Sequence, residues 1–439
     1  MEKEELIVLF CYIVLTLIMT YPLIFKMNFY TTGDTQAFIW SFWWVKHALF
    51  DFKTDLFYTN HIFYPIGMDL SLYTLTYFNT FFSLPLQLFF DEIVTYNIMF
   101  LFSFIVSGFG MFLLVRYLTN DIRASFVTGI IFAFCPFRFA HAMGHMTVLS
   151  TEWIPFYVLY LIKTLKETNK KNAILAGIFL ALNALSEWHY LLFLTLFSIF
   201  FLFYYYMKDR KTLLNKKFLI NGIVLLSVFL LITFPFLFKL LGASSNPGAK
   251  RQLDPSIMTS ADLMSFFVPS EFHPIFGKYV SGIYSLFTGI TQENTHFIGY
   301  TVIFLSVFAI FKLWEKTKIW FFLGIIFFVL SLGPVLHIFG KFLYSSPIQF
   351  GNILRNSGFY LTNIGYDLLN RFIGIPLPYL FLHYTVPFFK LFRTPGRFSV
   401  LVIFSFSVIA GYSLSLLLKK STYKNLVFIM FLIYKFFFA

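Results

Sequence analysis

The chain has 439 residues, of which 59% are hydrophobic and 12% charged, with a mean hydropathy of +0.77 and a net charge of +13. Soluble domains carry about 25% charged residues, so this composition excludes an ordinary soluble protein and predicts an all-α polytopic membrane protein. The basic residues lie in short connectors between apolar runs rather than on one soluble face, which excludes a nucleic-acid-binding domain.

The first apolar run, 5–26, is long enough to cross a bilayer, because a membrane-spanning helix needs roughly 20 apolar residues. It is longer than the apolar part of a secretory signal and follows an acidic start, MEKEE, so we interpret it as a retained span. With the later runs it predicts about 11 transmembrane helices in a single integral-membrane domain, 1–439. The later runs are 93–115, 124–141, 146–165, 173–188, 189–207, 218–241, 295–313, 319–337, 398–418 and 425–439.

Charge predicts the topology. The five short connectors at 116–123, 163–171, 208–217, 312–318 and 419–424 hold 17 Lys and Arg residues. The three long connectors, which hold only 11, are 27–92, 242–294 and 338–397. Because Lys and Arg mark cytoplasmic loops, we expect a cytoplasmic N-terminus and long connectors on the outer face. This alternation requires that 72–90 does not span but forms an outer-surface or re-entrant element.

The first long connector begins with TTGDTQAFIW, 31–40. Residues 35–50 predict a helix lying at the membrane interface, with Phe38, Trp40, Trp44 and Phe50 on roughly one face. An aromatic belt explains the tryptophans equally well. Asp34 is either the N-cap of this helix or a working carboxylate, and the two roles are compatible.

A second group of polar residues lies in CPFRFAHAMGHMTVLSTEW, 135–153, which contains Arg138, His141, His145 and Glu152. On a continuous helix His141 and His145 would share a face, a spacing that suits a metal pair. Gly144 favours a break between them, and substrate binding and interface packing remain alternatives. Glu152 lies inside a predicted span, where an ionisable residue is a candidate for function.

Two further groups lie near predicted outer ends of spans. Glu187 and His189, in SEWHY, are either substrate contacts or exposed turn residues. Arg393 and Arg397, in FKLFRTPGRF, directly precede a span on the outer side, together with Lys390. Guanidinium groups bind phosphate oxygens bidentately, so we expect an anionic partner, either a lipid-linked substrate or ordinary lipid headgroups.

Together these groups predict one cavity at the outer leaflet. Its chemistry suits transfer from a lipid-phosphate donor to an acceptor hydroxyl. A carboxylate would act as general base, and arginines would stabilise the charge that develops on the leaving phosphate.

The ordered motifs of the chain resemble the GT-C superfamily of integral-membrane glycosyltransferases, in particular a YfhO-like bacterial and archaeal branch. The motifs are GD at 33–34, FYPIG at 63–67, RFAHAMGHMTVLSTEWIP at 138–155, ADLMSFFVP at 261–269, SLGP at 331–334 and RTPGRF at 393–398. The resemblance implies a GT-C-like fold, a polyprenyl-phosphate sugar donor and Asp34 as catalytic base. It further implies that Arg393 and Arg397 bind the donor phosphate.

The same resemblance implies an enzyme of cell-envelope glycosylation in a prokaryotic plasma membrane, with its active site on the outer face. The acceptor is a lipid, a glycan or a protein. The first long connector has no clear DE or DxD pair of the family, which leaves open whether a divalent metal takes part.

Two other functions compete with this one. A transporter or flippase of a lipid-linked glycan would use the same cavity, but it predicts internal repeats and charged sites near the midplane. We find no convincing repeat, and the ionisable residues crowd toward one side. A non-catalytic GT-C-like membrane protein also remains open.

Overall fold

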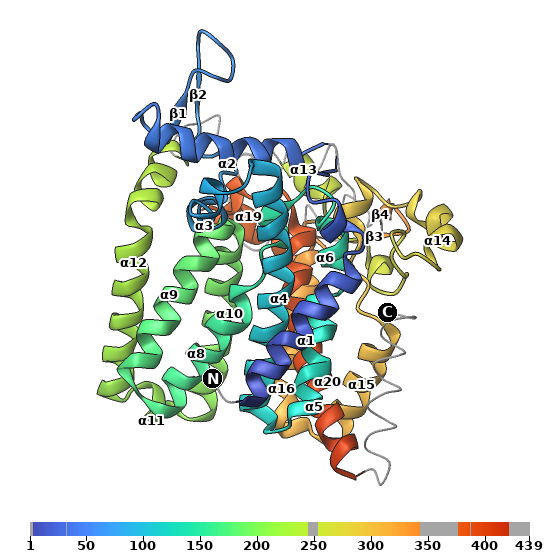
Figure 1. Cartoon of the computed structure of the whole chain (residues 1–439). Coiled ribbons are helices and arrows are strands. Elements are labelled where there is room, and N and C mark those ends of the chain that lie inside the picture. The colour runs from blue at the N-terminus through green and yellow to red at the C-terminus, as the bar shows by residue number, and fades with distance from the viewer. Residues whose placement is uncertain (1–2, 32, 245–252, 343–375, 387, 421–439) are drawn as a thin grey trace, which may run out of the picture.

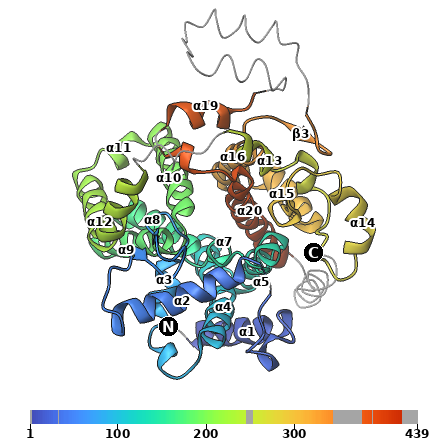
Figure 2. The same ribbon diagram turned by 90° about the horizontal axis from the view of Figure 1, so that it is seen from above.

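The computed structural model describes residues 3–31, 33–244, 253–342, 376–386 and 388–420. Long helices run side by side along one direction, and short elements gather at one end of this bundle (Figure 1). Seen along the bundle, α5, α7 and α20 lie near the middle, with α1, α12 and α14 at the periphery (Figure 2). The bundle is therefore a single packed body.

The long helices follow most of the apolar runs of the sequence. They are α1 (Lys3–Met19), α4 (Glu92–Thr119), α5 (Ile122–Ala133), α8 (Trp153–Glu167), α9 (Lys170–Ser186), α10 (Trp188–Lys208), α12 (Lys216–Ser244), α15 (Tyr300–Lys312), α16 (Trp314–Ser331) and α20 (Ser399–Lys420). One predicted span, 146–165, is divided into α7 (Met146–Leu149) and α8 by a short break.

Within the described ranges, five helices are long and apolar enough to cross a membrane. They are Glu92–Thr119, Ile122–His141, Trp188–Lys208, Lys216–Ser244 and Pro395–Lys419. The predicted number of about 11 spans is not confirmed, because several helices are short. The 15 residues of α8, for example, rise only about 22 Å. The predicted span 425–439 lies outside the described residues.

The two ends of the bundle differ as the charge pattern predicts. The basic connectors α4–α5, α8–α9, α10–α12 and α15–α16 all lie at one end, which includes α11 (Arg210–Leu213) (Figure 1). The long connectors place their elements at the other end: α2 (Thr35–Phe50), α3 (Tyr77–Phe82), α13 (Leu253–Met258), α14 (Gly277–Tyr284) and α19 (Pro378–Thr385). Which end faces the cytoplasm stays a prediction.

The first long connector contains two helices of different kinds. The predicted helix 35–50 is confirmed as α2, which lies across the ends of the long helices (Figure 1). Segment 72–90 contains only α3 and a short 3-10 turn, Leu86–Leu88. Because six helical residues rise about 9 Å, α3 is far too short to cross a bilayer.

The predicted aromatic face of α2 was wrong, because at 100° per residue Phe38 lies about 160° around the helix from Trp40 and about 120° from both Trp44 and Phe50. Phe38 and Trp44 are buried together with Phe42, whereas Phe50 is 60% exposed. Trp40 is half-buried and stacks on Trp44, with ring centroids 5.7 Å apart. At 100° per residue, Phe50 points away from the side that packs on α3 and α4.

The all-α prediction missed two small antiparallel hairpins. Strands β1 (Tyr58–Thr59) and β2 (Met68–Asp69) pair Tyr58 with Asp69, and β3 (His337–Ile338) pairs with β4 (Lys341–Phe342). The β1–β2 hairpin projects beyond α2, away from the long helices (Figure 1). Neither hairpin alters the helical character of the bundle.

Candidate functional site

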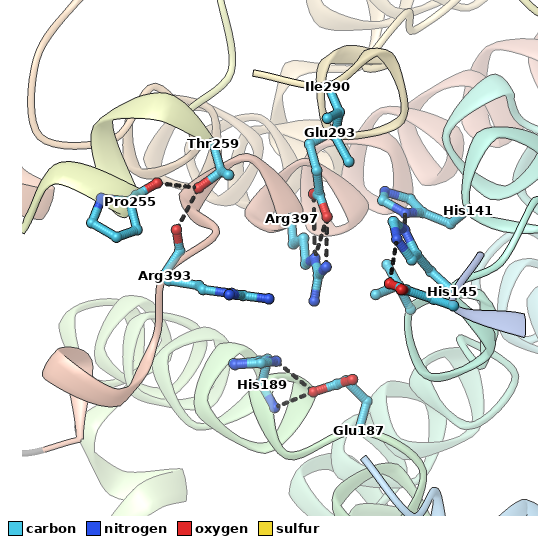
Figure 3. A network of polar contacts seen from close by, with 12 residues as sticks. His141, His145, Glu187, His189, Pro255, Thr259, Ile290, Glu293, Arg393 and Arg397 are labelled. Carbon is cyan, nitrogen blue, oxygen red and sulfur yellow. Dashed lines mark hydrogen bonds and ion pairs between the residues drawn. The ribbon is translucent and has the colours of Figure 1, made fainter. Parts of the chain in front are cut away.

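Five chain segments bring ionisable side chains together at the α2 end of the bundle. They are the start of α2, the turn after α6 (Pro136–His141), the α9–α10 junction, the 3-10 turn η5 (Thr291–Asn294) and the segment before α20. Most of these side chains are drawn in Figure 3, where they face a common space. The long helices set the positions of all five segments.

Asp34 occupies the N-cap position of α2, but its side chain makes no capping hydrogen bond. Its carboxylate is 74% exposed, and Oδ2 lies 3.5 Å from Nε2 of His145. The capping role is therefore unused in the structure. The carboxylate points instead toward the histidines, and much of its surface is accessible.

His141 and His145 face each other, although they do not lie on one continuous helix. Helix α6 ends at His141, and the chain turns through Gly144, whose φ of +132° favours glycine. The two Nδ1 atoms are nevertheless 2.9 Å apart. Burial has the largest effect on the pKa of His145 and lowers it below its usual range, and the positive charge of Arg397 lowers it further. This imidazole is therefore neutral at pH 7.

Glu293 and Arg397 form a buried bidentate pair. The Nε and Nη2 atoms of Arg397 donate to Oε1 of Glu293 over 3.1 and 2.5 Å, and Nε also donates to Oε2 over 3.3 Å. Burial is the largest single influence and raises the pKa of Glu293, but Arg397, together with His141 and His145, lowers this pKa to about 2. Glu293 is therefore a carboxylate at neutral pH.

Sequence reasoning missed Glu293. It lies in the long connector 242–294, which has no spacing pattern to single out a carboxylate. The available signal was its position seven residues before the apolar run of α15. His296, three residues later, was also missed. Its Nδ1 atom bonds the Ser399 hydroxyl over 2.8 Å, and burial lowers its pKa to about 4.

Glu187 and His189 form the opposite wall of the space in Figure 3. Glu187 caps α10 by accepting a hydrogen bond from the backbone N–H of His189, and its Oε1 lies 2.5 Å from Nδ1 of the same residue. Glu187 is buried and His189 half-buried, so they are not exposed turn residues. Burial would raise the pKa of Glu187, but His189 and then Arg397 lower it to about 2.

Arg393 is exposed, and its guanidinium extends into the space between Arg397 and His189 (Figure 3). Its backbone carbonyl accepts a hydrogen bond from the Thr259 hydroxyl, which fixes the start of the side chain. Within the part of the chain that the structure describes, no hydrogen bond or ion pair engages this guanidinium. It is available to an anionic ligand.

The structure does not bring Arg138 and Glu152 into this cluster. Arg138 is fully buried and donates to the carbonyls of Ala133 and Leu149 and to the Ser103 hydroxyl. The Ser103 hydroxyl in turn donates a hydrogen bond to Oε2 of Glu152 over 2.7 Å. These contacts favour a structural role for Arg138 and Glu152, and their predicted role as substrate contacts stays a prediction.

An apolar cavity of about 920 Å³ lies beside the cluster. Its wall comes from the end of α1, from α4, from the α5–α6 segment and from residues 270–275, and includes Phe100 and Phe134. Thr31 and Met143, also in the wall, lie close in the chain to Asp34 and His145. Its size falls in the range of small-molecule sites, roughly 300–1,000 Å³.

Residues 8–369 match the family described as Domain of unknown function (DUF6311). The chain belongs to this family. No curated protein matches it. Among solved structures it is similar to the archaeal oligosaccharyltransferase AglB from Archaeoglobus fulgidus, in complex with an inhibitory peptide and a dolichol-phosphate. The TM-score is 0.47 and the sequence identity is 13%, and the match covers 98% of this chain and 54% of the AglB chain. The chain therefore spans about half the length of AglB.

The DUF6311 match divides the candidate site. It includes Asp34, the two histidines, Glu187 and Glu293, whereas the segment with Arg393 and Arg397 lies beyond residue 369. The family description states no activity, and the YfhO-like branch stays a prediction. A proposal for the function therefore depends on the geometry of the site.

Proposed function

We propose that this DUF6311 protein is a GT-C-type glycosyltransferase that moves a sugar from a polyprenyl-phosphate-linked donor to an acceptor hydroxyl. The observation that supports this most is the convergence of an accessible carboxylate, Asp34, with two arginines, Arg393 and Arg397, at one end of an apolar bundle. We place this end at the outer face of a prokaryotic plasma membrane. The acceptor is a lipid, a glycan or a protein.

Asp34 supplies the base. The Oδ2 atom faces His145, and the second carboxylate oxygen accepts the proton of the acceptor hydroxyl. The acceptor oxygen then forms a bond to the anomeric carbon of the sugar. A positioned general base contributes roughly 10²–10⁴ in rate. His145 holds the carboxylate in place.

The two arginines stabilise the leaving phosphate. As the bond from the anomeric carbon to the phosphate oxygen breaks, its electron pair stays on the phosphate. The guanidinium of Arg393, which has no hydrogen-bond or ion-pair partner among the described residues, offsets this charge. Arg397 is held by Glu293 and presents its remaining N–H groups.

The apolar cavity accommodates an isoprenoid or acyl chain of a substrate. Its wall is mostly aromatic and aliphatic, and it borders the segments that carry Asp34 and His145. A lipid chain there would keep its polar end beside the carboxylate. A flippase would need charged sites through the depth of the bundle, whereas the labelled site residues face one common space (Figure 3).

Sugar transfer from a panel of polyprenyl-phosphate sugars tests this proposal in membranes that contain wild type, Asp34→Asn or Asp51→Asn. We expect wild-type transfer, a loss of about 100-fold or more in Asp34→Asn, and near-normal rates in Asp51→Asn. Asp51 is the matched control because it is an exposed carboxylate at the other end of α2, paired with His47.

Equal rates in Asp34→Asn and wild type would overturn the role of Asp34. Donor that crosses the bilayer of proteoliposomes without sugar transfer would support the flippase. Donor binding with neither transfer nor crossing would support the non-catalytic protein.

A further inference from the structure

We propose that His141, His145 and Glu293 form a binding site for a divalent transition-metal ion. One ring nitrogen of each histidine and one carboxylate oxygen of Glu293 lie within 4.8 Å of one another. None of the steps proposed for glycosyl transfer uses this ion. The site therefore goes beyond that function and can be tested without it.

The ligand set comes from two distant parts of the chain. His141 and His145 flank the turn after α6, and Glu293 lies in η5, about 150 residues later. Ligands of a tetrahedral ion at 2.0–2.1 Å lie about 3.4 Å apart. Small side-chain rotations would therefore close the observed group around an ion.

The histidine nitrogens are poorly satisfied without an ion. His141 is fully buried, and its Nε2 atom has no hydrogen-bond partner among the described residues. A buried polar atom without a partner costs free energy. The Nδ1 atoms of His141 and His145 share a single contact of 2.9 Å. Each histidine offers one ligand atom, so an ion would bind His141 either at its unpartnered Nε2 or at the Nδ1 that faces His145.

The surrounding groups fit a metal site. Histidine ligands commonly donate their other ring N–H to a carboxylate, and carboxylate ligands are themselves hydrogen-bonded. Here Asp34 Oδ2 lies 3.5 Å from His145 Nε2, on the side of the ring away from Nδ1. The Nε and Nη2 atoms of Arg397 donate hydrogen bonds to the Glu293 carboxylate. Asp34 and Arg397 are thus positioning residues for the proposed ligands.

The ligand types predict which ions bind. Imidazole suits zinc, copper, iron and nickel, whereas magnesium and calcium favour sites made wholly of oxygen. Two imidazoles and one carboxylate therefore select zinc, or cobalt as its spectroscopic substitute, over magnesium. Three protein ligands leave one position of a tetrahedral ion open to a substrate or water.

The experiment uses the full chain, purified in detergent, stripped with a chelator and titrated with Co²⁺. We expect about one bound equivalent, with visible absorption bands of tetrahedral Co²⁺ that Zn²⁺ removes and millimolar Mg²⁺ does not. His145→Ala and Glu293→Gln should weaken binding at least about 10-fold. His61→Ala is the control, because this histidine is exposed and outside the group.

Unfolding temperature provides a second measurement that does not depend on the spectrum. Zn²⁺ should raise the unfolding temperature of wild type and His61→Ala, but not that of His145→Ala. Equal Co²⁺ binding by wild type and both ligand variants would overturn the site, as would no binding by wild type. Metal binding without sugar transfer would retain the site and reject only the proposed enzyme.

Discussion

Arg138 and Arg397 are both largely buried arginines, but their surroundings differ. The guanidinium of Arg138 makes four hydrogen bonds, three of them to backbone carbonyls, and lies 4.4 Å from the centroid of the Phe104 ring. The side chain of Arg397 is 14% exposed and pairs with Glu293. It also lies next to a space that other charged residues face (Figure 3).

This difference distinguishes a structural environment around Arg138 from the proposed donor-binding role of Arg397. An arginine has five N–H donors and no acceptor, so the protein either satisfies those donors or leaves some to a ligand. The chain around Ala133 and Leu149 uses the donors of Arg138. In the sequence both residues are arginines near the end of a predicted span. Residue type and position along the chain therefore could not distinguish them.

The largest expected effect is on stability, in Arg138→Met. This change leaves the carbonyls of Ala133 and Leu149 without their donors and Glu152 without its neighbouring positive charge. We expect a loss of about 3–5 kcal/mol in the free energy of unfolding, measured by denaturant unfolding in detergent. The exposed Arg123→Met is the control and should change stability by less than about 0.5 kcal/mol. Equal stability of Arg138→Met and wild type would remove the contrast with Arg397.

Arg397 and Glu293 can be tested as a pair. Arg397→Gln leaves the buried Glu293 without its partner, so we expect a loss of about 3 kcal/mol in stability. Glu293→Gln with Arg397→Gln should recover much of this loss, since neither charge remains. Donor binding should stay weak in the double variant. Recovery of donor binding would show that Arg397 serves only to neutralise Glu293.

Arg393→Gln should act on the donor rather than on the fold. The side chain is exposed and has no partner among the described residues, so stability should stay within about 0.5 kcal/mol of wild type. The loss of a charge-assisted bond to phosphate should raise the donor KM about 10-fold. Lys390→Gln is the control, because its ammonium instead lies 5.5 Å from the Tyr384 ring centroid. Similar KM values for both variants would indicate non-specific attraction to lipid.

A smaller effect is expected from pH through Glu187. His189 and Arg397 face this carboxylate and lower its pKa from the ordinary 4.5 to about 2. Its contribution to stability is therefore complete above about pH 4.5 and lost as the pH falls toward 2. Wild type should be more stable than Glu187→Gln at pH 6, and the difference should shrink between pH 4.5 and 2. A constant difference would show that Glu187 acts only as the cap of α10.

Much of the architecture could be predicted from the sequence. Apolar runs mark the long helices, and the short basic connectors alternate with the long ones as the bundle requires. The sequence also marked α2 and the turn with His141 and His145. These features depend on hydropathy, charge and spacing over short stretches of chain, so they can be read without knowing the packing.

Only the packing decided which polar residues work together. Arg397 pairs with Glu293 across 104 residues, and Ser103 and Leu149 accept hydrogen bonds from Arg138, although both arginines lie at or near the end of a predicted span. Helix lengths and the break between α7 and α8 likewise emerged only in the structure. A hydrogen bond depends on distances of about 3 Å, and in a bundle those distances are set by how distant helices pack, which short-range patterns do not contain.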